Sequence, residues 1–287
     1  EPTMTQATLP PPALPRRSPG ESLAARYRAV RAASETLAQP LEIEDYVIQS
    51  MPDVSPTKWH LAHTTWFFER FILREHVPGY AFFREAYDFL FNSYYNTIGP
   101  MHCRPNRGLI SRPTVREVYT YRHAIDERML DLLASADAAT LARLRPILDV
   151  GLHHEQQHQE LMVTDLKHVF STNPLLPAYR GTREGVQSPE SRVPSRMRAD
   201  SGLGTWVEFP GGVYEIGMDA DPDVFGFDNE SPRHRVYLQP FALASRPVTN
   251  GDYIRFIEEG GYTRPELWLA LGLATVKREG WTHPIYW

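Results

Sequence analysis

The strongest chemical signal in the sequence is the run His-His-Glu-Gln-Gln-His-Gln-Glu at residues 153–160. In a helix, at about 100° per residue, His154 and His158 project within roughly 40° of each other. The same stripe carries Ile147, Val150, Leu161 and Asp165. Two imidazoles one turn apart on a largely apolar face can hold one metal ion. The alternative is a pair of packed, hydrogen-bonded histidines, and the flanking amides, which can orient ligands, favour the metal.

Two histidines do not complete a metal site, and the best candidates for a third ligand are His60 and His63, on another expected helix. They are three residues apart, so we expect one to point inward and the other to lie at the surface or behind the ligands. Three histidines leave positions open for a substrate and O2, as in non-haem iron sites in which an imidazole replaces the carboxylate. Ligand type alone does not separate iron from zinc, nickel or cobalt.

The spacing His-Glu-x-x-His also occurs in zinc proteases, where the glutamate acts as the base. In this chain Gln156 and Gln157 stand between the histidines, at positions where that class packs apolar residues. The helix is also expected to lie inside a bundle of helices. A protease is therefore disfavoured.

Four long helices are expected to position these histidines. They cover residues 21–38, 57–76, 114–134 and 137–171, each with apolar residues at helical spacing. Ser55, followed by Pro56, is expected to cap the second helix, and Thr114 and Asp137 the third and fourth. A crossover over residues 78–113, long enough to be functional, separates the second helix from the third. This arrangement is typical of a four-helix bundle with a metal site between facing helices.

Composition limits the kinds of protein that the chain can be. Its 287 residues suffice for two domains, and 42% hydrophobic and 23% charged residues are typical of a soluble globular protein. A formal net charge of −5 gives no electrostatic reason to expect a nucleic acid or an anionic membrane as partner. No apolar run approaches the roughly 20 residues that span a bilayer. One cysteine excludes an internal disulfide framework and, without the apolar stretch of a signal peptide, predicts a cytoplasmic protein.

The sequence pattern changes near residue 205. Residues 1–20 are proline-rich and predict a flexible arm, and residues 173–204 mix proline, serine, glycine and arginine and predict a linker. Segments 207–209, 211–217 and 234–238 alternate with period two, and a short helix is expected over 252–259. The expected fold class is therefore α+β and multidomain, with a four-helix domain at 21–172 and an incomplete mixed domain at 205–287.

Several motifs carry a resemblance to a known family. The runs Trp-His-Leu-Ala-His at 59–63 and His-Glu-Gln-Gln-His at 154–158 resemble the DinB-like iron domain of the ergothioneine sulfoxide synthases. Residues 227–234, 247–253 and 260–262 resemble the formylglycine-generating-enzyme-like domain of that family, a relative of C-type lectins. The resemblance covers nearly the whole chain from residue 21.

The resemblance implies a single Fe(II) held by His63, His154 and His158. His63 is taken over His60 because the ligand of the family is the histidine of Leu-Ala-His. Such enzymes use O2 to join the sulfur of cysteine or γ-glutamylcysteine to C2 of the imidazole of hercynine, Nα-trimethylhistidine. The product is a sulfoxide, and the expected partners are hercynine, the thiol and O2.

The crossover is expected to supply further site residues. Tyr94 and Tyr95 are candidates for a proton donor that prevents dioxygenation of the thiol, and their alternative role is aromatic packing. Three arginines of the same segment are candidates for bidentate binding of substrate carboxylates, although loop arginines are often only solvated: Arg104, Arg107 and Arg112. Gln157 is expected to hydrogen-bond the hercynine side through water.

Three alternatives stay open at this point. An ovothiol-type sulfoxide synthase acts at C5 of unmethylated histidine, usually with a methyltransferase domain that is not seen here. A DinB-like thiol transferase uses a similar three-histidine bundle with zinc or nickel and no O2, and the motifs after residue 205 disfavour it. A non-catalytic binding protein is disfavoured because a structural metal site is normally closed by a fourth protein ligand. The resemblance also implies that the second domain continues past Trp287, its remainder being a separate chain or a missing piece.

Overall fold

The computed structural model describes residues 23–95, 97–180, 206–219, 221 and 224–287. The chain divides into two compact units, Glu1–Gly181 and Thr182–Trp287, which are described separately. The expected arm at 1–20 and the part of the expected linker from 181 to 204 lie outside the described residues.

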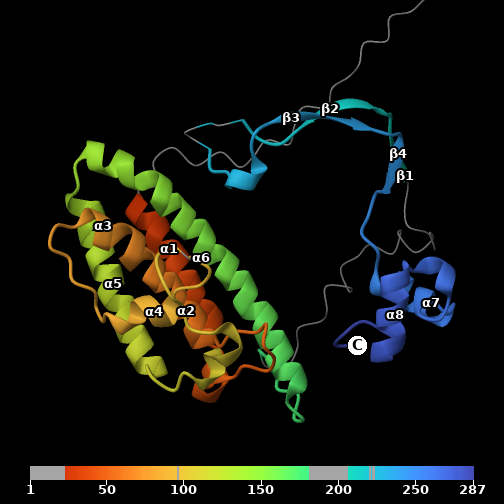
Figure 1. The fold of residues 1–287 in the computed structure, drawn as a ribbon, viewed down its shortest axis with the longest axis horizontal. Helices are drawn as coiled ribbons and strands as arrows, with labels where there is room; N and C mark the ends of the chain where they lie inside the picture. The colour runs from red at the N-terminus through yellow and green to blue at the C-terminus, as the bar shows by residue number, and fades with distance from the viewer. Residues whose placement is uncertain (1–22, 96, 181–205, 220, 222–223) are drawn as a thin grey trace, which may run out of the picture. The chain divides into compact units, whose positions relative to one another are not determined.

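Four long helices form the first unit: α1 Leu23–Ala38, α2 Thr57–Phe68, α5 Val115–Ser135 and α6 Ala138–Thr172. They pack side by side, and both α1 and α2 contact α5 and α6 (Figure 1). The core of buried apolar side chains runs between these helices. The expected four-helix bundle is therefore confirmed.

Helix starts follow the expected capping residues in two of three cases. Thr114 accepts from the backbone N–H of Glu117, whose side chain returns to Thr114, and this capping box begins α5. Asp137 accepts from the N–H of Thr140 and begins α6. The expectation for Ser55 is wrong, because Pro56 holds the N-cap position of α2 and no side chain caps it. The polar groups of Ser55 are bonded elsewhere, as described below.

The crossover contains more helix than expected. It includes α4 Ala86–Phe91 and the 3-10 turn η3 Arg104–Leu109, whereas a π-helical turn, η2 Glu69–Leu73, and a short helix, α3 Arg74–His76, prolong α2 and complete the helix expected over 57–76. A further 3-10 turn, η1 Ile43–Val47, links α1 to α2. The Glu69 carboxylate is fully buried and accepts hydrogen bonds from the hydroxyls of Tyr80 and Tyr121. These bonds hold the start of the crossover against the bundle.

Helix α2 is enclosed on every side, since all twelve of its residues are buried. It packs tightly against α6 at Gly151, where an added Cβ would lie 2.6 Å from a ring carbon of Phe68 and 2.7 Å from one of Phe67. Only a residue without a side chain allows this separation of the two backbones. Gly151 lies three residues before His154, so the close approach occurs within one turn of the expected ligands.

The second unit contains four short strands: β1 Trp206–Phe209, β2 Gly212–Ile216, β3 His234–Leu238 and β4 Phe241–Ala244. β1 pairs with β4 and β2 with β3, both antiparallel. The other elements are η6 Asp228–Glu230, α7 Asn250–Glu258, η7 Pro265–Leu267 and α8 Ala270–Glu279. The expected α+β class is confirmed. None of the helices in the described ranges has the length and apolar character needed to cross a membrane.

Candidate metal centre

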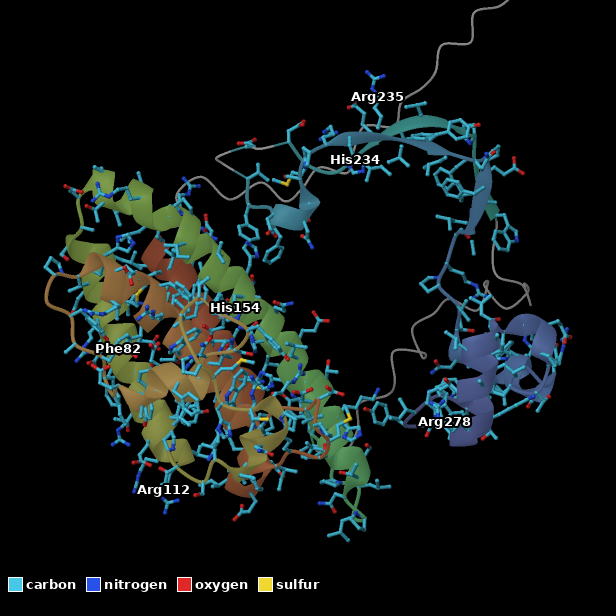
Figure 2. All side chains as sticks on the ribbon, viewed as in Figure 1. Phe82, Arg112, His154, His234, Arg235 and Arg278 are labelled. Carbon is cyan, nitrogen blue, oxygen red and sulfur yellow. The ribbon has the colours of Figure 1, made fainter. Side chains whose placement is uncertain are left out.

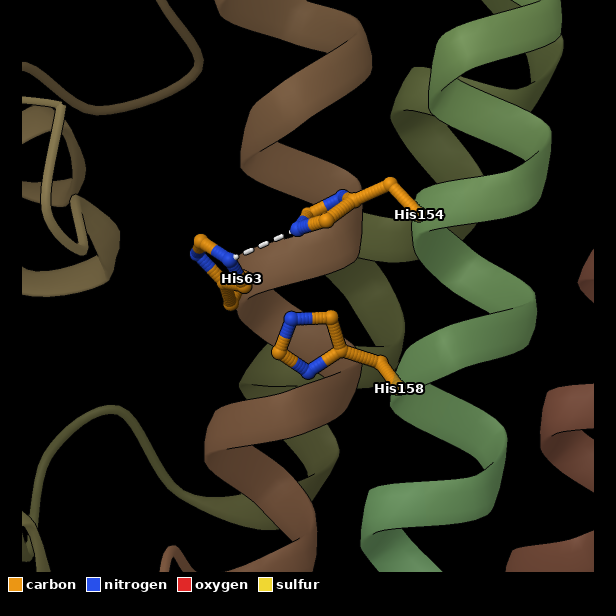
Figure 3. A group of neighbouring side chains, drawn as sticks. All are labelled: His63, His154 and His158. Atoms are coloured by element: carbon orange, nitrogen blue, oxygen red, sulfur yellow. Dashed lines mark hydrogen bonds between the residues drawn. The ribbon is translucent and has the colours of Figure 1, made fainter. Parts of the chain in front are cut away.

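Three imidazole rings meet between α2 and α6. His63 comes from α2, and His154 and His158 come from successive turns of α6 (Figure 3). One nitrogen of each ring lies within 4.8 Å of the others, and the Nε2 atoms of His63 and His154 are 3.1 Å apart. The structure thus brings together the three residues expected to ligate a metal.

The ring of His63 is held in one orientation. Its Nδ1 lies 2.6 Å from the carbonyl oxygen of Phe91, so Nδ1 carries the proton and donates it. The lone pair of Nε2 is then directed towards the other two histidines. The ring is stacked between Trp59, with centroids 4.6 Å apart, and Trp66, at 5.6 Å. Both the tautomer and the tilt of this ligand are therefore fixed by its surroundings.

The electrostatics of the cluster favour neutral imidazoles. Burial lowers the pKa of His63 well below the usual range, and the neighbouring His154 lowers it further. Burial also lowers the pKa of His154 to about 4. For His158, burial and then the nearby His63 lower the pKa strongly. All three rings are uncharged at neutral pH, so a metal ion does not have to displace protons from them.

The donor set fits one divalent transition metal ion. With metal–nitrogen bonds of about 2.1 Å, two ligands at a right angle have nitrogens about 3.0 Å apart. The 3.1 Å separation of the Nε2 atoms of His63 and His154 matches that value. Three neutral nitrogen donors, without a fourth His, Cys, Asp or Glu ligand in the described residues, leave coordination positions for guests.

A cavity of about 360 Å³ opens onto the three histidines. It lies between α2, α6 and the crossover, and its lining includes Trp59, Ser93, Leu161 and Asp165. Leu161 is 39% exposed, and Val150 on the same stripe is 37% exposed. The stripe of α6 that carries the ligands therefore borders open space rather than the core that the sequence pattern indicated.

Both tyrosines of the crossover line this cavity. Tyr94 has φ = +62°, a left-handed backbone conformation that costs a residue other than glycine roughly 1–2 kcal/mol. Its hydroxyl accepts a hydrogen bond from Nη1 of Arg104 at 3.1 Å. Tyr95 packs against the rings of Trp66 and Phe71, and burial raises the pKa of its hydroxyl.

Two of the three candidate arginines reach the cavity. Arg107 is buried and donates to the hydroxyls of Ser55 and Ser93, both at 2.9 Å, while its guanidinium lies 3.4 Å from the ring centroid of Trp59. Burial, with a smaller effect of Arg104, lowers the pKa of Arg107 to about 10, which leaves it cationic at neutral pH. Arg104 also donates to the backbone carbonyl of Asp53.

Arg112 and Gln157 differ in their placement. Arg112 is exposed, donates to the carbonyl of Ser111 and does not line the cavity, and Figure 2 shows it projecting from the edge of the first unit. Gln157 lies between the ligands of α6 and does line the cavity. The structure therefore assembles Gln157 with the histidines but leaves Arg112 apart from them.

Both histidines of α2 are buried, with exposed fractions of 3% for His60 and 2% for His63, and His60 lies behind His158 and not at the surface. Nδ1 of His60 lies 2.9 Å from Nδ1 of His158, and its Nε2 lies 3.0 Å from Oδ2 of Asp165. Residues three apart in a helix project about 60° from each other, and the enclosure of α2 on all sides explains why both histidines are buried. A signal was present, since Asp165 follows His158 by seven residues, two helical turns along the same stripe.

Comparison with known proteins divides the chain in the same order as its two units. Residues 26–162 match the DinB superfamily, and residues 192–285 match the sulfatase-modifying factor enzyme 1-like domain. The histidine cluster lies wholly within the first match.

The relatives include proteins named hercynine oxygenase. That of Mycolicibacterium smegmatis is 28% identical over 260 residues, which is 89% of this chain and 55% of the relative. That of Mycobacterium tuberculosis is 29% identical over 272 residues, 93% of this chain and 57% of the relative. Ergothioneine biosynthesis protein 1 of Neurospora crassa is 27% identical over 170 residues, 55% of this chain and 18% of the relative. The chain thus spans about half the length of the two hercynine oxygenases.

Proposed function

Because this chain belongs to the proteins that join a DinB domain to a sulfatase-modifying-factor-like domain and are related to hercynine oxygenases, we propose that it is a sulfoxide synthase of ergothioneine biosynthesis. The proposed reaction joins the sulfur of cysteine or γ-glutamylcysteine to C2 of the hercynine imidazole. One oxygen atom of O2 enters the sulfoxide and the other leaves as water. Formation of the C–S bond and oxidation of the sulfur supply two electrons each, which balances the four-electron reduction of O2.

The observation that carries the proposal is the open three-histidine cluster at the base of a cavity. When bound there, Fe(II) would supply the one-electron chemistry that O2 requires. His63, His154 and His158 are the residues that would hold it. Since all three are neutral, they add no negative charge, and the centre favours an anionic thiolate as a guest.

The arginines of the crossover support recognition of an acidic thiol. Arg104 and Arg107 line the same cavity as the histidines, and within the described residues neither forms an ion pair with a carboxylate. A cationic wall next to the metal ligands suits a substrate that carries both a thiol and a carboxylate. Guanidinium groups bind carboxylates with well-defined geometry, which would also direct the sulfur towards the centre.

The placement of the two tyrosines supports a role as proton donor during the reaction. Arg104 donates to the oxygen of Tyr94, which leaves the hydroxyl proton of Tyr94 free to be donated into the cavity. Tyr95 presents its hydroxyl from an apolar setting of Trp66 and Phe71. Gln157, on the α6 side, offers an amide for hydrogen bonds to the hercynine side. Tyr94, Tyr95 and Gln157 all line the cavity that opens onto the three histidines, which supports these roles.

The first test concerns the metal centre alone. The chain should bind one Fe(II) or Co(II) per molecule under anaerobic conditions, and alanine at position 63, 154 or 158 should abolish this binding. His123→Ala is the matched control, since the side chain of His123 is 59% exposed and lies outside the cluster. Addition of cysteine or γ-glutamylcysteine to the Co(II) form should produce a thiolate-to-metal absorption band. Unchanged stoichiometry in the ligand variants would contradict the assignment.

The second test concerns the reaction. The Fe(II) form should consume O2 only when hercynine and a thiol are both present, and mass spectrometry should detect a conjugate with one added oxygen atom. A conjugate formed without consumption of O2 would instead indicate a metal-dependent thiol transferase. Conjugation at C5 of unmethylated histidine, with hercynine unused, would indicate an ovothiol-type enzyme.

A further inference from the structure

A chain of hydrogen bonds leads from the candidate ligand His158 along the wall of the cavity, which His60 and Asp165 also line. It runs from Nδ1 of His158 to Nδ1 of His60, 2.9 Å, and from Nε2 of His60 to Oδ2 of Asp165, 3.0 Å. We infer that His60, supported by Asp165, is a positioning residue that fixes the tautomer and orientation of the ligand His158. This inference rests on the proposed metal centre but not on the proposed reaction.

The direction of each hydrogen bond follows from the geometry of His158. Figure 3 shows one ring nitrogen of His158 turned towards His63 and His154 and the other turned away. The outward nitrogen is Nδ1, which faces His60, so the inward one is Nε2. A metal on Nε2 takes that lone pair, and the neutral ring then keeps its proton on Nδ1. His158 therefore donates, and Nδ1 of His60 accepts.

The second bond is determined by the first. A neutral His60 that accepts at Nδ1 carries its own proton on Nε2, and this proton is donated to the carboxylate of Asp165. Asp165 is itself oriented, because its Oδ2 also accepts from the backbone N–H of Ser55 at 2.8 Å. The result is an ordered series, carboxylate to histidine to ligand histidine, in which every proton has one position.

The same contacts exclude His60 as a fourth ligand in this arrangement. Its Nδ1 approaches the outward nitrogen of His158, not the inward nitrogens that converge on the centre. His60 is only 3% exposed and lies on α2, whereas His158 and Asp165 lie on α6. His60 thus joins the two helices that supply the ligands. Removal of such an outer partner typically weakens metal binding 10–100-fold.

Two variants of nearly equal size separate the two hydrogen bonds of His60. In His60→Asn the side-chain oxygen takes the place of Nδ1, which keeps the acceptor for His158 and loses the donor to Asp165. In His60→Gln the amide reaches the place of Nε2, which keeps the bond to Asp165 and loses the acceptor for His158. We expect the dissociation constant for Co(II) to rise roughly 10–100-fold in His60→Gln and to stay within about threefold of wild type in His60→Asn.

Proton NMR of the Co(II) form gives a readout that does not involve activity. Each ligand bound through Nε2 should contribute one strongly shifted, exchangeable N–H signal, three in all for the wild-type chain. In His60→Gln the signal of His158 should exchange with water at least about tenfold faster. The signal of His63, whose proton is bonded to Phe91, should not change and serves as the internal control.

Several results would overturn the inference. One is that His60→Gln and His60→Asn have equal Co(II) affinities and equal exchange rates of the His158 N–H. Another is that the N–H signals of both variants match those of the wild-type chain. A fourth shifted N–H signal in the wild-type chain would make His60 a ligand, and this measurement needs no variant to fold. Absence of Co(II) binding would overturn the metal centre itself, whereas failure of sulfoxide formation with the three signals intact would overturn only the proposed reaction.

Discussion

The carboxylate of Glu155 binds the guanidinium of Arg31, with 2.9 Å between Oε2 and Nη1, where neither side chain is more than 3% exposed. Its other oxygen accepts from Arg122 at 2.6 Å and from Ser34 at 2.6 Å. Glu155 of α6 thus joins α1 and α5. Because it follows His154 directly in the sequence, the same turn of α6 carries a candidate metal ligand on one face and this ion-pair network on the other.

Glu155→Gln should destabilise the fold strongly. The substitution leaves two buried guanidinium groups without their shared carboxylate, and loss of one partner from a buried ion pair lowers stability by about 3–5 kcal/mol. Chemical denaturation of the metal-free chain measures the change. Glu160→Gln, at an exposed position of the same helix, is the control and should change stability by less than about 0.5 kcal/mol. Equal stability of the two variants would contradict the structural role of the network.

Stability of the metal-free chain should decline in acid, first through the buried histidines and at lower pH also through Glu155. The folded pKa of His154 is about 4, below the usual 6.5, so the unfolded chain binds a proton that the folded chain does not. This contribution is complete above about pH 6.5 and is lost as the pH falls towards 4. For Glu155, burial raises the pKa but Arg122 and Arg31 lower it to about 2, so its contribution is lost between about pH 4.5 and 2.

Thermal unfolding between pH 7 and 3 tests this assignment. His154→Gln should flatten the decline between pH 6.5 and 4 relative to wild type. Bound Co(II) should steepen the dependence on pH in the same range, because protons compete with the metal for the imidazoles. A melting temperature independent of pH from 6.5 to 4 would show that the histidines are not held neutral.

Gly151→Ala should destabilise the bundle although alanine favours a helix. The added Cβ would lie 2.6 Å from the ring of Phe68, and overpacking of this kind lowers stability by about 1–3 kcal/mol. This exceeds the gain of about 1 kcal/mol from helix propensity. In a Phe68→Leu background the effect of alanine at 151 should shrink, and calorimetry of the four proteins measures the coupling. A stabilising effect of the single variant would contradict the close packing.

Tyr94→Phe should lower the rate of sulfoxide formation by about 10²-fold or more, since a positioned proton donor contributes that much. Consumption of O2 should continue, with oxidation of the thiol to a sulfinic acid in place of C–S bond formation. Tyr95→Phe is the matched comparison and should have the smaller effect, because no arginine supports its hydroxyl oxygen within the described residues. Equal product ratios in both variants would exclude Tyr94 as the donor.

Sequence reasoning predicted the elements that depend on local rules. Helical spacing located the four long helices, and Thr114 and Asp137 marked two of their starts. It also offered His60 and His63 as candidate partners for the pair on α6, because a bundle brings ligands from separate helices together. These features follow from periodicity and residue type, whereas the choice of His63 over His60 came from the resemblance to the DinB-like iron domain.

The features that were missed depend on contacts between elements. Helix α2 is apolar or buried all round, so periodicity did not indicate which way His60 points. Ser55 was expected to cap α2, but contacts from α6 and the crossover take its N–H and hydroxyl. Among the arginines, only the fold of the crossover separates Arg107, stacked on Trp59, from the exposed Arg112. No local pattern distinguishes them.

The stacking of His63 between two indoles should make metal binding detectable by tryptophan fluorescence. Trp59 lies 4.6 Å and Trp66 5.6 Å from the ring of that ligand, centroid to centroid. A paramagnetic ion such as Co(II) held by His63 would quench the emission of both indoles, whereas Zn²⁺, with a filled d shell, would leave most of it. Occupancy of the centre should therefore be readable from intrinsic fluorescence, without a label, and Trp59→Phe should remove part of the signal.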